Sequence, residues 1–396
     1  MKKLNPLRRP VSPAPEDHAA AGDLLRVLCV LMIGWYHIWQ QSWLTPRLRL
    51  GGTTLDLYPW VRAGYMFVDL MLLLSGFLIY LPYAADRPPT PRDFLRRRAA
   101  RILPSYWLCL AVMLLFAARE PDFGDGARLA KDLAVHLGFV HNLFRFSYTQ
   151  TQLNVVLWTL AVEVQFYLLV PALAPAFRKW PLACWAAMTG AALCFRHLWT
   201  GPMADTTLFV NRLPNLLDLY ANGMLAAHLY VRLARRNDRR ALIAALGTLL
   251  CLLGAWGVLR LVRDQSFIYG DYELIRHGQL RRRWLLGVCG AAFLLGGSLG
   301  FSPLRRLLSN RLVRLLSALS FNFYIWHQWL AVRLKEWRIP PYLAEADPNQ
   351  AGEMPWQLHY TLLCFAAALA LAALVTFLLE RPCARRIARP APKGRS

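Results

Sequence analysis

The sequence predicts an all-α, polytopic membrane protein that crosses the bilayer about ten times. Hydrophobic residues make up 56% of the 396 positions and charged residues only 17%, which is more apolar than a soluble domain requires. Several apolar runs exceed the ~18 residues that a spanning helix needs. The 15 tryptophans and 15 tyrosines fit aromatic belts at the two membrane interfaces. These observations favour an integral membrane protein over a soluble one.

The apolar runs define ten candidate spans. Lys and Arg collect on the cytoplasmic side of membrane proteins, and most basic clusters here share one side if both termini are cytoplasmic. One cluster, Arg281–Arg283, falls on the opposite side and is an exception to this topology. The clusters that agree are Arg96–Arg98, Arg235–Arg236, Arg239–Arg240, Arg305–Arg306 and Arg385–Arg386. The candidate spans are residues 24–43, 63–83, 102–118, 152–174, 181–199, 209–231, 241–260, 284–301, 312–332 and 358–379.

The chain divides into one transmembrane domain, residues 23–382, and two short ends. Residues 1–22 are rich in proline and predict a disordered cytoplasmic arm. A cleaved signal peptide is not expected, because the following apolar segment is too long for one. Residues 383–396 are expected to form a basic cytoplasmic tail. The eight cysteines contain no Cys-x-x-Cys pattern, so neither a disulfide framework nor a metal site is expected.

The net charge of +23 has two explanations. Proteins that bind nucleic acid are often this basic. A membrane protein, however, retains Lys and Arg at its cytoplasmic face, where they also contact anionic lipid. In a chain this apolar the second explanation is favoured, so we expect the lipid bilayer and not nucleic acid as a partner. Composition does not predict an oligomeric state.

Arg26 and His37 lie inside the first predicted span with ten residues between them. Eleven steps of about 100° return almost to the starting direction, so both side chains share one helix face, roughly 16 Å apart along the axis. An ionisable residue inside a bilayer costs free energy and usually marks a functional site. Arg26 could bind an anion near one end of the span, while His37, deeper inside, could transfer a proton.

Asp69, Glu163 and His327 are further ionisable residues inside predicted spans. At about 1.5 Å per residue, they and His37 fall in or near the outer half of the bilayer. A buried carboxylate must be protonated, paired or hydrated. Structural alternatives exist, since Asp69 could pair two helices and a lone histidine such as His327 often makes only an interhelical hydrogen bond. The four residues together nevertheless predict a buried reaction centre.

The residue types indicate acid–base chemistry. An imidazole titrates near neutral pH, so His37 can take a proton from a hydroxyl and return one to a leaving group. Glu163 could orient that imidazole or share its proton. Ser75 could act as a nucleophile, but a Ser-Gly pair in a span is more often a close helix contact. The candidate catalytic residues are therefore His37, Glu163, Asp69 and His327.

A basic cluster precedes the third span. Arg98 and Arg101 lie one helical turn apart, and Arg97 is next to them. Guanidinium groups suit phosphate, and this cluster lies at the same membrane face as Arg26. The alternative is ordinary anchoring of the span by positive charge. We interpret Arg26, Arg97, Arg98 and Arg101 as candidates for binding a phosphate-bearing donor.

Several short patterns follow one another in a fixed order. Arg26 and His37 are preceded by Asp23, and Glu163 lies within an aromatic-rich segment. The remaining patterns are Val68–Ile79 (VDLMLLLSGFLI), Arg98 and Arg101 before Pro104, Tyr106 and Trp107, Trp158–Leu168 (WTLAVEVQFYL), Ser320–His327 (SFNFYIWH) and Glu380–Pro382 (ERP).

These patterns resemble the acyltransferase-3 family of integral membrane acyltransferases over residues 23–382. This sequence departs from the family at Thr159, where Ser is usual, and at Val164, where a second Glu is common. It also has Phe321–Phe323 where a Ser-Tyr run is usual. None of these departures removes a candidate site residue.

The resemblance implies transfer of an acyl group, usually acetyl, from coenzyme A to an acceptor hydroxyl at a bacterial inner membrane. Arg26, Arg98 and Arg101 would hold the phosphates of acetyl-coenzyme A, and His37 would act on the acceptor hydroxyl or the acyl group. Family acceptors include envelope saccharides, lipid-linked sugars and macrolides, and the sequence does not choose among them. A proton-coupled transporter using the same His, Glu and Asp residues is the alternative, although no internal repeat is visible.

Overall fold

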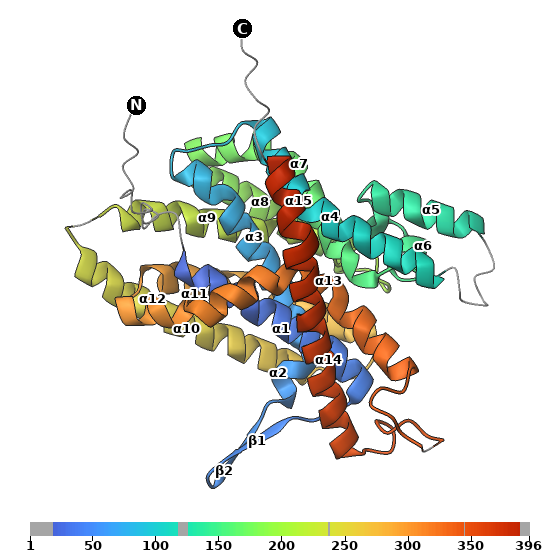
Figure 1. Ribbon diagram of the computed structural model, residues 1–396. Helices are drawn as coiled ribbons and strands as arrows, with labels where there is room; N and C mark the ends of the chain where they lie inside the picture. Colours follow the sequence, from blue (N-terminus) through green and yellow to red (C-terminus); the bar gives the residue numbers. More distant parts are fainter. Residues whose placement is uncertain (1–18, 118–125, 237, 344, 389–396) are drawn as a thin grey trace, which may run out of the picture.

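The computed structural model describes residues 19–117, 126–236, 238–343 and 345–388. These residues are almost entirely helical (Figure 1). The first half contains α1 (Ala20–Ser42), β1 (Arg47–Leu50), β2 (Thr53–Asp56), α2 (Tyr58–Arg62), η2 (Gly64–Met66), α3 (Phe67–Ala84), α4 (Pro91–Ala117), α5 (Gly126–Leu137), η3 (His141–Leu143), α6 (Arg145–Tyr148), η4 (Val155–Leu157), α7 (Trp158–Lys179) and α8 (Pro181–Phe195). The second half contains η5 (Arg196–Thr200), η6 (Leu213–Leu216), α9 (Leu217–Ala234), α10 (Arg240–Ser266), α11 (Tyr272–Leu299), α12 (Ser302–Leu308), α13 (Arg311–Glu336), α14 (Met354–Val375), η7 (Thr376–Glu380) and α15 (Arg381–Ala388).

The nearly all-α, multi-span architecture is confirmed, while the expected number of ten spans stays a prediction. Each predicted span overlaps a helix. Among the described residues, however, only six helices are long and apolar enough to cross a membrane, or seven if the bent pair α11–α12 counts as one span. The shortfall has a physical cause: α8 has only 15 residues, and polar side chains inside α9 and α13, such as Asn222 and His327, make these helices less apolar. The cytoplasmic placement of both termini also stays a prediction.

The predicted ends of the domain fall mostly outside the described residues. Residues 1–18 and 389–396 are not described, so the expected arm and tail are untested there. α1 already begins at Ala20, within the predicted arm, and α15 continues through the first residues of the predicted tail. The helical region therefore extends slightly beyond residues 23–382 at both ends.

The β1–β2 hairpin is the one departure from helical structure among the described residues, and no expectation anticipated it. Leu48 pairs with Leu55 and Arg49 with Thr54 in an antiparallel register. The turn contains Gly51 and Gly52, and Gly51 has a φ of 59°. A tight hairpin turn requires such positive φ values, which glycine adopts without steric cost. The hairpin follows α1 in the chain and projects away from the helices (Figure 1).

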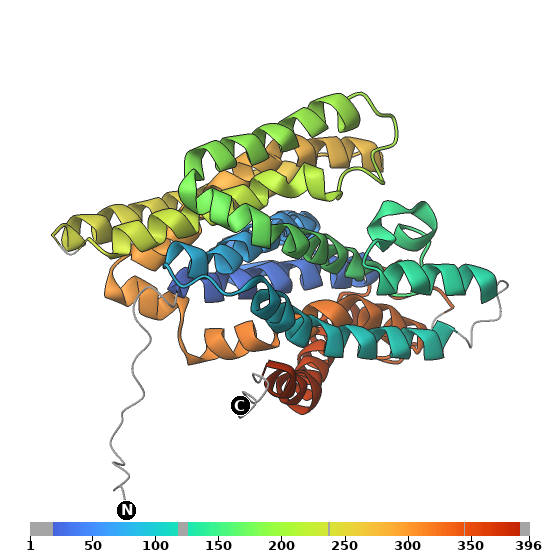
Figure 2. The ribbon, with the colours of Figure 1, turned by 90° about the horizontal axis from the view of Figure 1, so that it is seen from above.

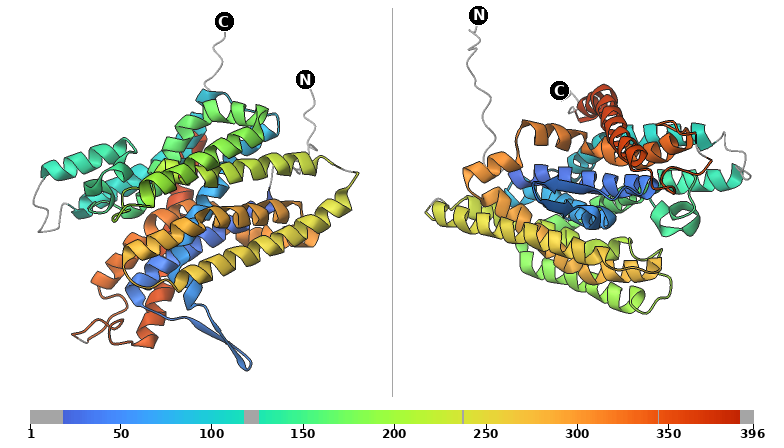
Figure 3. Two further views of the ribbon diagram at one scale, coloured as in Figure 1. Left: turned by 180° about the vertical axis from the view of Figure 1, so that it is seen from behind. Right: turned by 90° about the horizontal axis from the view of Figure 1, so that it is seen from below.

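The helices form three layers when the molecule is seen from above (Figure 2). α1 and α3 lie in the middle layer, with α7, α8 and α9 on one side and α13 and α14 on the other. The views from behind and below show α10 alongside α11 (Figure 3). The central layer therefore places the polar side chains of α1 where helices on both sides can contact them.

Small residues allow the helices to approach closely. A Cβ added to Gly76 of α3 would lie 2.6 Å from the backbone oxygen of Tyr220 in α9, and one added to Gly223 would lie 2.0 Å from the oxygen of Leu73. Helix pairs in membranes commonly use small residues in this way. Gly76 thus supports the expectation that the Ser75–Gly76 pair belongs to a helix contact.

We expect Gly223→Val to lower the melting temperature of the purified protein, because the new side chain must push α3 and α9 apart. Overpacking of this kind costs about 1–3 kcal/mol. Gly190→Val is the matched control, since nothing lies within 4 Å of a Cβ at that position. Equal melting temperatures for Gly223→Val and the wild type would contradict this close contact.

Candidate functional site

A narrow cavity of about 80 Å³ opens among α1, α3, α4, α7 and α13. Three of the predicted donor-binding residues, Arg26, Arg98 and Arg101, line it together with Glu163. They come from three helices, so the fold brings together charges that are distant in sequence. We call this space the arginine cavity. Its lining residues are Arg26, Val30, Met71, Leu74, Ser75, Leu78, Arg98, Arg101, Ile102, Thr159, Leu160, Glu163, Tyr167, Ser320, Phe321 and Tyr324.

Helical spacing positions the basic side chains of the arginine cavity. Arg98 and Arg101 are one turn apart on α4 and reach the same space. The guanidinium carbon of Arg98 lies 5.4 Å from the ring centre of Phe94 and 5.5 Å from that of Tyr167, within cation–π range. Arg97 differs, because it is exposed and does not line this cavity. The structure therefore does not place Arg97 with the other three arginines.

Two carboxylates balance part of the positive charge. Glu163 lines the arginine cavity, and Tyr167 donates a hydrogen bond of 3.0 Å to its Oε2. Glu380 interacts electrostatically with Arg101 and Arg26, and Asn322 donates a 2.6 Å hydrogen bond to it. These contacts hold acidic groups beside the arginines. A phosphate-bearing ligand could enter such a mixed site and compete with the carboxylates for the guanidinium groups.

His37 lines a second, wider cavity of about 260 Å³. We call it the histidine chamber. Aromatic rings and amide side chains dominate its lining, a combination that can stack on sugar rings and hydrogen-bond to hydroxyl groups. The lining residues are Tyr36, His37, Tyr65, Val68, Val155, Val156, Trp158, Asn211, Tyr272, Ile275, Arg276, Gln279, Tyr324 and Gln328.

The hydrogen bond made by His37 assigns its tautomer. The Nδ1 atom lies 2.9 Å from Oε1 of Gln40, and an amide oxygen only accepts, so Nδ1 donates. Gln40 in turn donates from Nε2 to the hydroxyl of Tyr36 at 3.1 Å. The Nε2 atom of His37 then carries a lone pair and can accept a proton. Among the described residues the partner of His37 is Gln40, so the expected orienting contact from Glu163 is not what the structure shows.

His327 packs next to His37 in the interior. Their ring centres are 5.3 Å apart, and His327 is only 1% exposed. Its Nδ1 lies 2.7 Å from the backbone oxygen of Tyr324 and 3.2 Å from that of Phe323. Carbonyl oxygens only accept, so Nδ1 carries the proton of His327. Its Nε2 has no hydrogen-bond partner among the described residues. The structure thus brings two of the predicted catalytic residues together, each with an unprotonated Nε2.

Tyr324 lines both the arginine cavity and the histidine chamber. Its hydroxyl donates to the backbone oxygen of Val156 at 3.1 Å and accepts from Thr159 at 3.0 Å. These bonds tie α13 to the start of α7. Tyr324 is 4% exposed, so its ring is held firmly between the two spaces. The cavity with the donor-binding candidates and the chamber with His37 therefore share one lining side chain.

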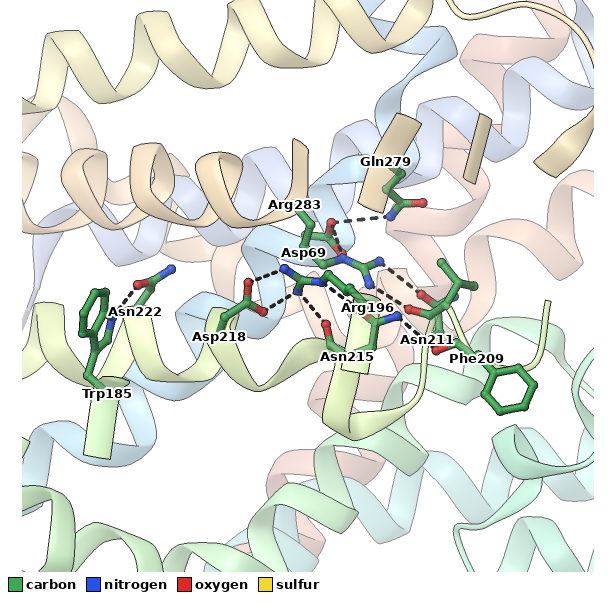
Figure 4. A network of polar contacts seen from close by, with 11 residues as sticks. Asp69, Trp185, Arg196, Phe209, Asn211, Asn215, Asp218, Asn222, Gln279 and Arg283 are labelled. Carbon is green, nitrogen blue, oxygen red and sulfur yellow. Dashed lines mark hydrogen bonds and ion pairs between the residues drawn. The ribbon is translucent and has the colours of Figure 1, made fainter. Parts of the chain in front are cut away.

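Asp69 lies outside this arrangement and is paired with Arg283 (Figure 4). Its Oδ2 lies 3.1 Å from Nε of Arg283, and both side chains are at most 1% exposed. Arg283 also donates to the backbone oxygen of Val210 at 2.7 Å, and Gln279 contacts Asp69 at 3.5 Å. These contacts support the helix-pairing role that the sequence left open for Asp69. They also explain the exceptional Arg281–Arg283 cluster, since Arg283 is a buried partner and not a loop charge.

A second buried ion pair lies beside the first. Arg196 donates to the two carboxylate oxygens of Asp218 at 2.8 Å and 2.6 Å, and its Nε donates to Asn215 at 2.8 Å. Figure 4 shows both pairs: Asp69–Arg283 joins α3 to α11, and Arg196–Asp218 joins η5 to α9. None of these four charged residues lines the arginine cavity or the histidine chamber. We interpret both as structural connections.

Sequence reasoning missed several residues that support the site. Gln40 follows His37 by three positions and Tyr167 follows Glu163 by four, so helical spacing was an available signal for both. Tyr324 and Arg283 offered no such signal, because their partners lie far away in the sequence. Within the described ranges, no group of three or more His, Cys, Asp or Glu residues could hold a metal ion.

Comparison with known proteins decides the family. A family model described as an acyltransferase domain matches residues 20–378, which is most of the chain. The chain belongs to the acyltransferase-3 family. The resemblance that the sequence patterns indicated is therefore confirmed.

Individual relatives are distant, and each match covers about half of the relative. The chain is 22% identical over 324 residues to the peptidoglycan O-acetyltransferase OatA of Listeria monocytogenes, covering 77% of this chain and 48% of that protein. It is 28% identical over 184 residues to nodulation protein 10 of Rhizobium leguminosarum, covering 43% of this chain and 48% of that protein. The chain thus spans about half the length of these relatives. No solved structure matches it.

We expect Arg283→Leu to destabilise the acyltransferase domain by about 3–5 kcal/mol, because it leaves the carboxylate of Asp69 buried without its partner. The double variant Asp69→Leu/Arg283→Leu should recover much of this loss. Reversible unfolding in mixed detergent measures both values. Arg281→Leu is the matched control, since Arg281 is exposed two residues away.

The same variants test the role of Asp69. A structural Asp69 predicts that the stable double variant retains acyl transfer. A folded double variant without activity would return Asp69 to the catalytic residues.

Proposed function

We propose that this chain transfers an acetyl group from acetyl-coenzyme A to a hydroxyl group of an envelope saccharide at the bacterial cell membrane. Membership of the acyltransferase-3 family supports acyl transfer. The name of the Listeria relative, a peptidoglycan O-acetyltransferase, supports a saccharide acceptor. The observation that carries the proposal is the meeting of the arginine cavity and the histidine chamber at Tyr324.

The donor would bind from the arginine side. Arg26, Arg98 and Arg101 supply guanidinium groups that suit the phosphates of coenzyme A. Arg26 and His37 lie on one face of α1, roughly 16 Å apart along the axis. A donor anchored at the arginines could therefore extend its thioester toward Tyr324 and the histidines. We infer that the acyl group travels inside the bundle along this face of α1.

The acceptor would bind in the histidine chamber. Nε2 of His37 takes the proton of the acceptor hydroxyl as the oxygen attacks the thioester carbonyl. The carbon–sulfur bond then breaks, and the thiolate of coenzyme A takes up that proton. The products are an acetyl ester and free coenzyme A. Gln40 is a positioning residue in this scheme, because its hydrogen bond keeps Nε2 unprotonated and turned toward the acceptor.

We expect His37→Ala to reduce acetyl transfer by about 10²–10⁴-fold, which is the usual contribution of a general base. The assay follows radiolabel from acetyl-coenzyme A into an envelope saccharide fraction, with the protein in lipid nanodiscs. His359→Ala is the matched control, because His359 is exposed on α14. Full activity of His37→Ala would rule out this role, whereas acceptor flux without covalent labelling would favour the transporter alternative.

We expect Arg98→Gln and Arg101→Gln each to weaken binding of coenzyme A, because each removes one phosphate-binding guanidinium. A charge-assisted hydrogen bond contributes about 1.5–3 kcal/mol, so the dissociation constant should rise at least about tenfold. Isothermal titration with coenzyme A measures it, and Arg92→Gln, an exposed position on α4, is the control. Unchanged affinity in both variants would assign these arginines to membrane anchoring.

We expect Tyr324→Ala to raise acceptor-independent hydrolysis of acetyl-coenzyme A relative to transfer. Removal of the ring joins the arginine cavity to the histidine chamber and admits water to the thioester. Tyr324→Phe keeps the ring and loses only the two hydrogen bonds of the hydroxyl, so its ratio of hydrolysis to transfer should stay near that of the wild type. Equal ratios in all three proteins would show that Tyr324 does not separate the two spaces.

A further inference from the structure

A third cavity, of about 460 Å³, lies between the end of α9, the start of α10, the end of α11 and α12. We call it the basic cavity. It shares no lining residue with the arginine cavity or the histidine chamber. The residues lining it are Tyr230, Leu233, Ala234, Arg236, Arg240, Ala241, Ile243, Ala244, Ser298, Leu299, Gly300, Phe301, Ser302 and Arg305.

The charge of the basic cavity is unbalanced. Arg236, Arg240 and Arg305 line it, and no carboxylate does so within the described part of the chain. The neighbouring arginines outside it are paired: Arg235 lies 3.1 Å from Asp86, and Arg239 lies 3.7 Å from Asp238. The described residues offer no such carboxylate to the three that line the cavity. The guanidinium groups of these three arginines are therefore available to an anionic ligand in the basic cavity.

Two residues that line the basic cavity, Ser298 and Arg305, have buried polar atoms without a hydrogen-bond partner among the described residues. Ser298 is 3% exposed, and its hydroxyl has no partner among the described residues. The Nε atom of Arg305 is likewise buried without an acceptor in the described part of the chain. Buried polar groups in folded proteins are normally hydrogen-bonded. An anionic group in the basic cavity would supply the acceptors that these donors lack.

The surroundings indicate an amphiphilic ligand at the edge of the membrane. Leucine side chains on the first turns of α10 are exposed, with Leu242 at 55% and Leu246 at 56%. Phe301 and Leu307, at the bend between α11 and α12, are exposed at 47% and 67%. The helix axes turn by 120° at this bend. Apolar side chains exposed beside a cluster of arginines are typical of the depth at which lipid headgroups lie.

We propose that the basic cavity binds the phosphate of an anionic membrane lipid, with Arg236, Arg240 and Arg305 around the headgroup and the acyl chains along the exposed leucines of α10. Basic pockets between membrane helices bind such headgroups, and guanidinium groups suit phosphate oxygens. The site is separate from the acyl-transfer residues, so it does not depend on the proposed function. Free phosphate shares the headgroup chemistry and is the competing source.

Native mass spectrometry of the full chain in detergent tests the proposal, with phosphatidylglycerol and phosphatidylcholine as the probes. The wild type should retain phosphatidylglycerol in preference to phosphatidylcholine. Arg240→Gln/Arg305→Gln should weaken phosphatidylglycerol binding about tenfold or more, since each arginine near a lipid surface contributes about a factor of five. Arg239→Gln, an exposed neighbour outside the cavity, should bind like the wild type.

Two outcomes would overturn the proposal. Equal retention of phosphatidylglycerol by the wild type and the double variant would show that the lipid binds elsewhere. Displacement of the lipid by millimolar inorganic phosphate, or binding of phosphate alone, would assign the cavity to a free anion. The single variant Arg236→Gln, at an exposed position, repeats the test if the double variant does not fold.

Discussion

The pairing of buried charges between helices is the constraint on which the rest of this structure depends. A bundle this apolar can hold an ionised side chain only if a partner compensates for the lost hydration. Asp69 meets Arg283 across α3 and α11, and Arg196 meets Asp218 beside them. The first pair connects α3 to α11, and the second connects η5 to α9. Through Asp69, the first pair holds α3 of the central layer against α11.

Helix α1 carries residues of both candidate sites. One face of α1 carries Arg26 near its start and His37 eleven residues later, and other helices lie on both sides of α1 (Figure 2). Arg26 meets the arginines of α4, while His37 meets His327 of α13. A single helix thus connects a site suited to phosphate with a site suited to proton transfer. Tyr324 lines both the arginine cavity and the histidine chamber, so the two sites adjoin at one side chain.

The same kind of residue serves different purposes here according to its partners. Arg283 is paired and fully buried, and it connects helices. Arg98 and Arg101 face a cavity that also holds a carboxylate, and they suit an exchangeable phosphate ligand. Arg236, Arg240 and Arg305 face a cavity without an acidic side chain in the described part of the chain. Position and pairing, more than residue type, distinguish the structural arginine from those that we propose to bind the donor and a lipid.

The sequence by itself determined the membrane class, the helical architecture, the family and the common face of Arg26 and His37. Those features depend on local apolar length and on helical periodicity, which neighbouring residues specify. Only the tertiary structure decided that Asp69 pairs with Arg283, that Glu163 lies with the arginines and that Tyr324 lines two cavities. Each of these depends on contacts between helices that are well separated in the sequence. Periodicity shows which face of a helix is polar, but it does not show which other helix that face meets.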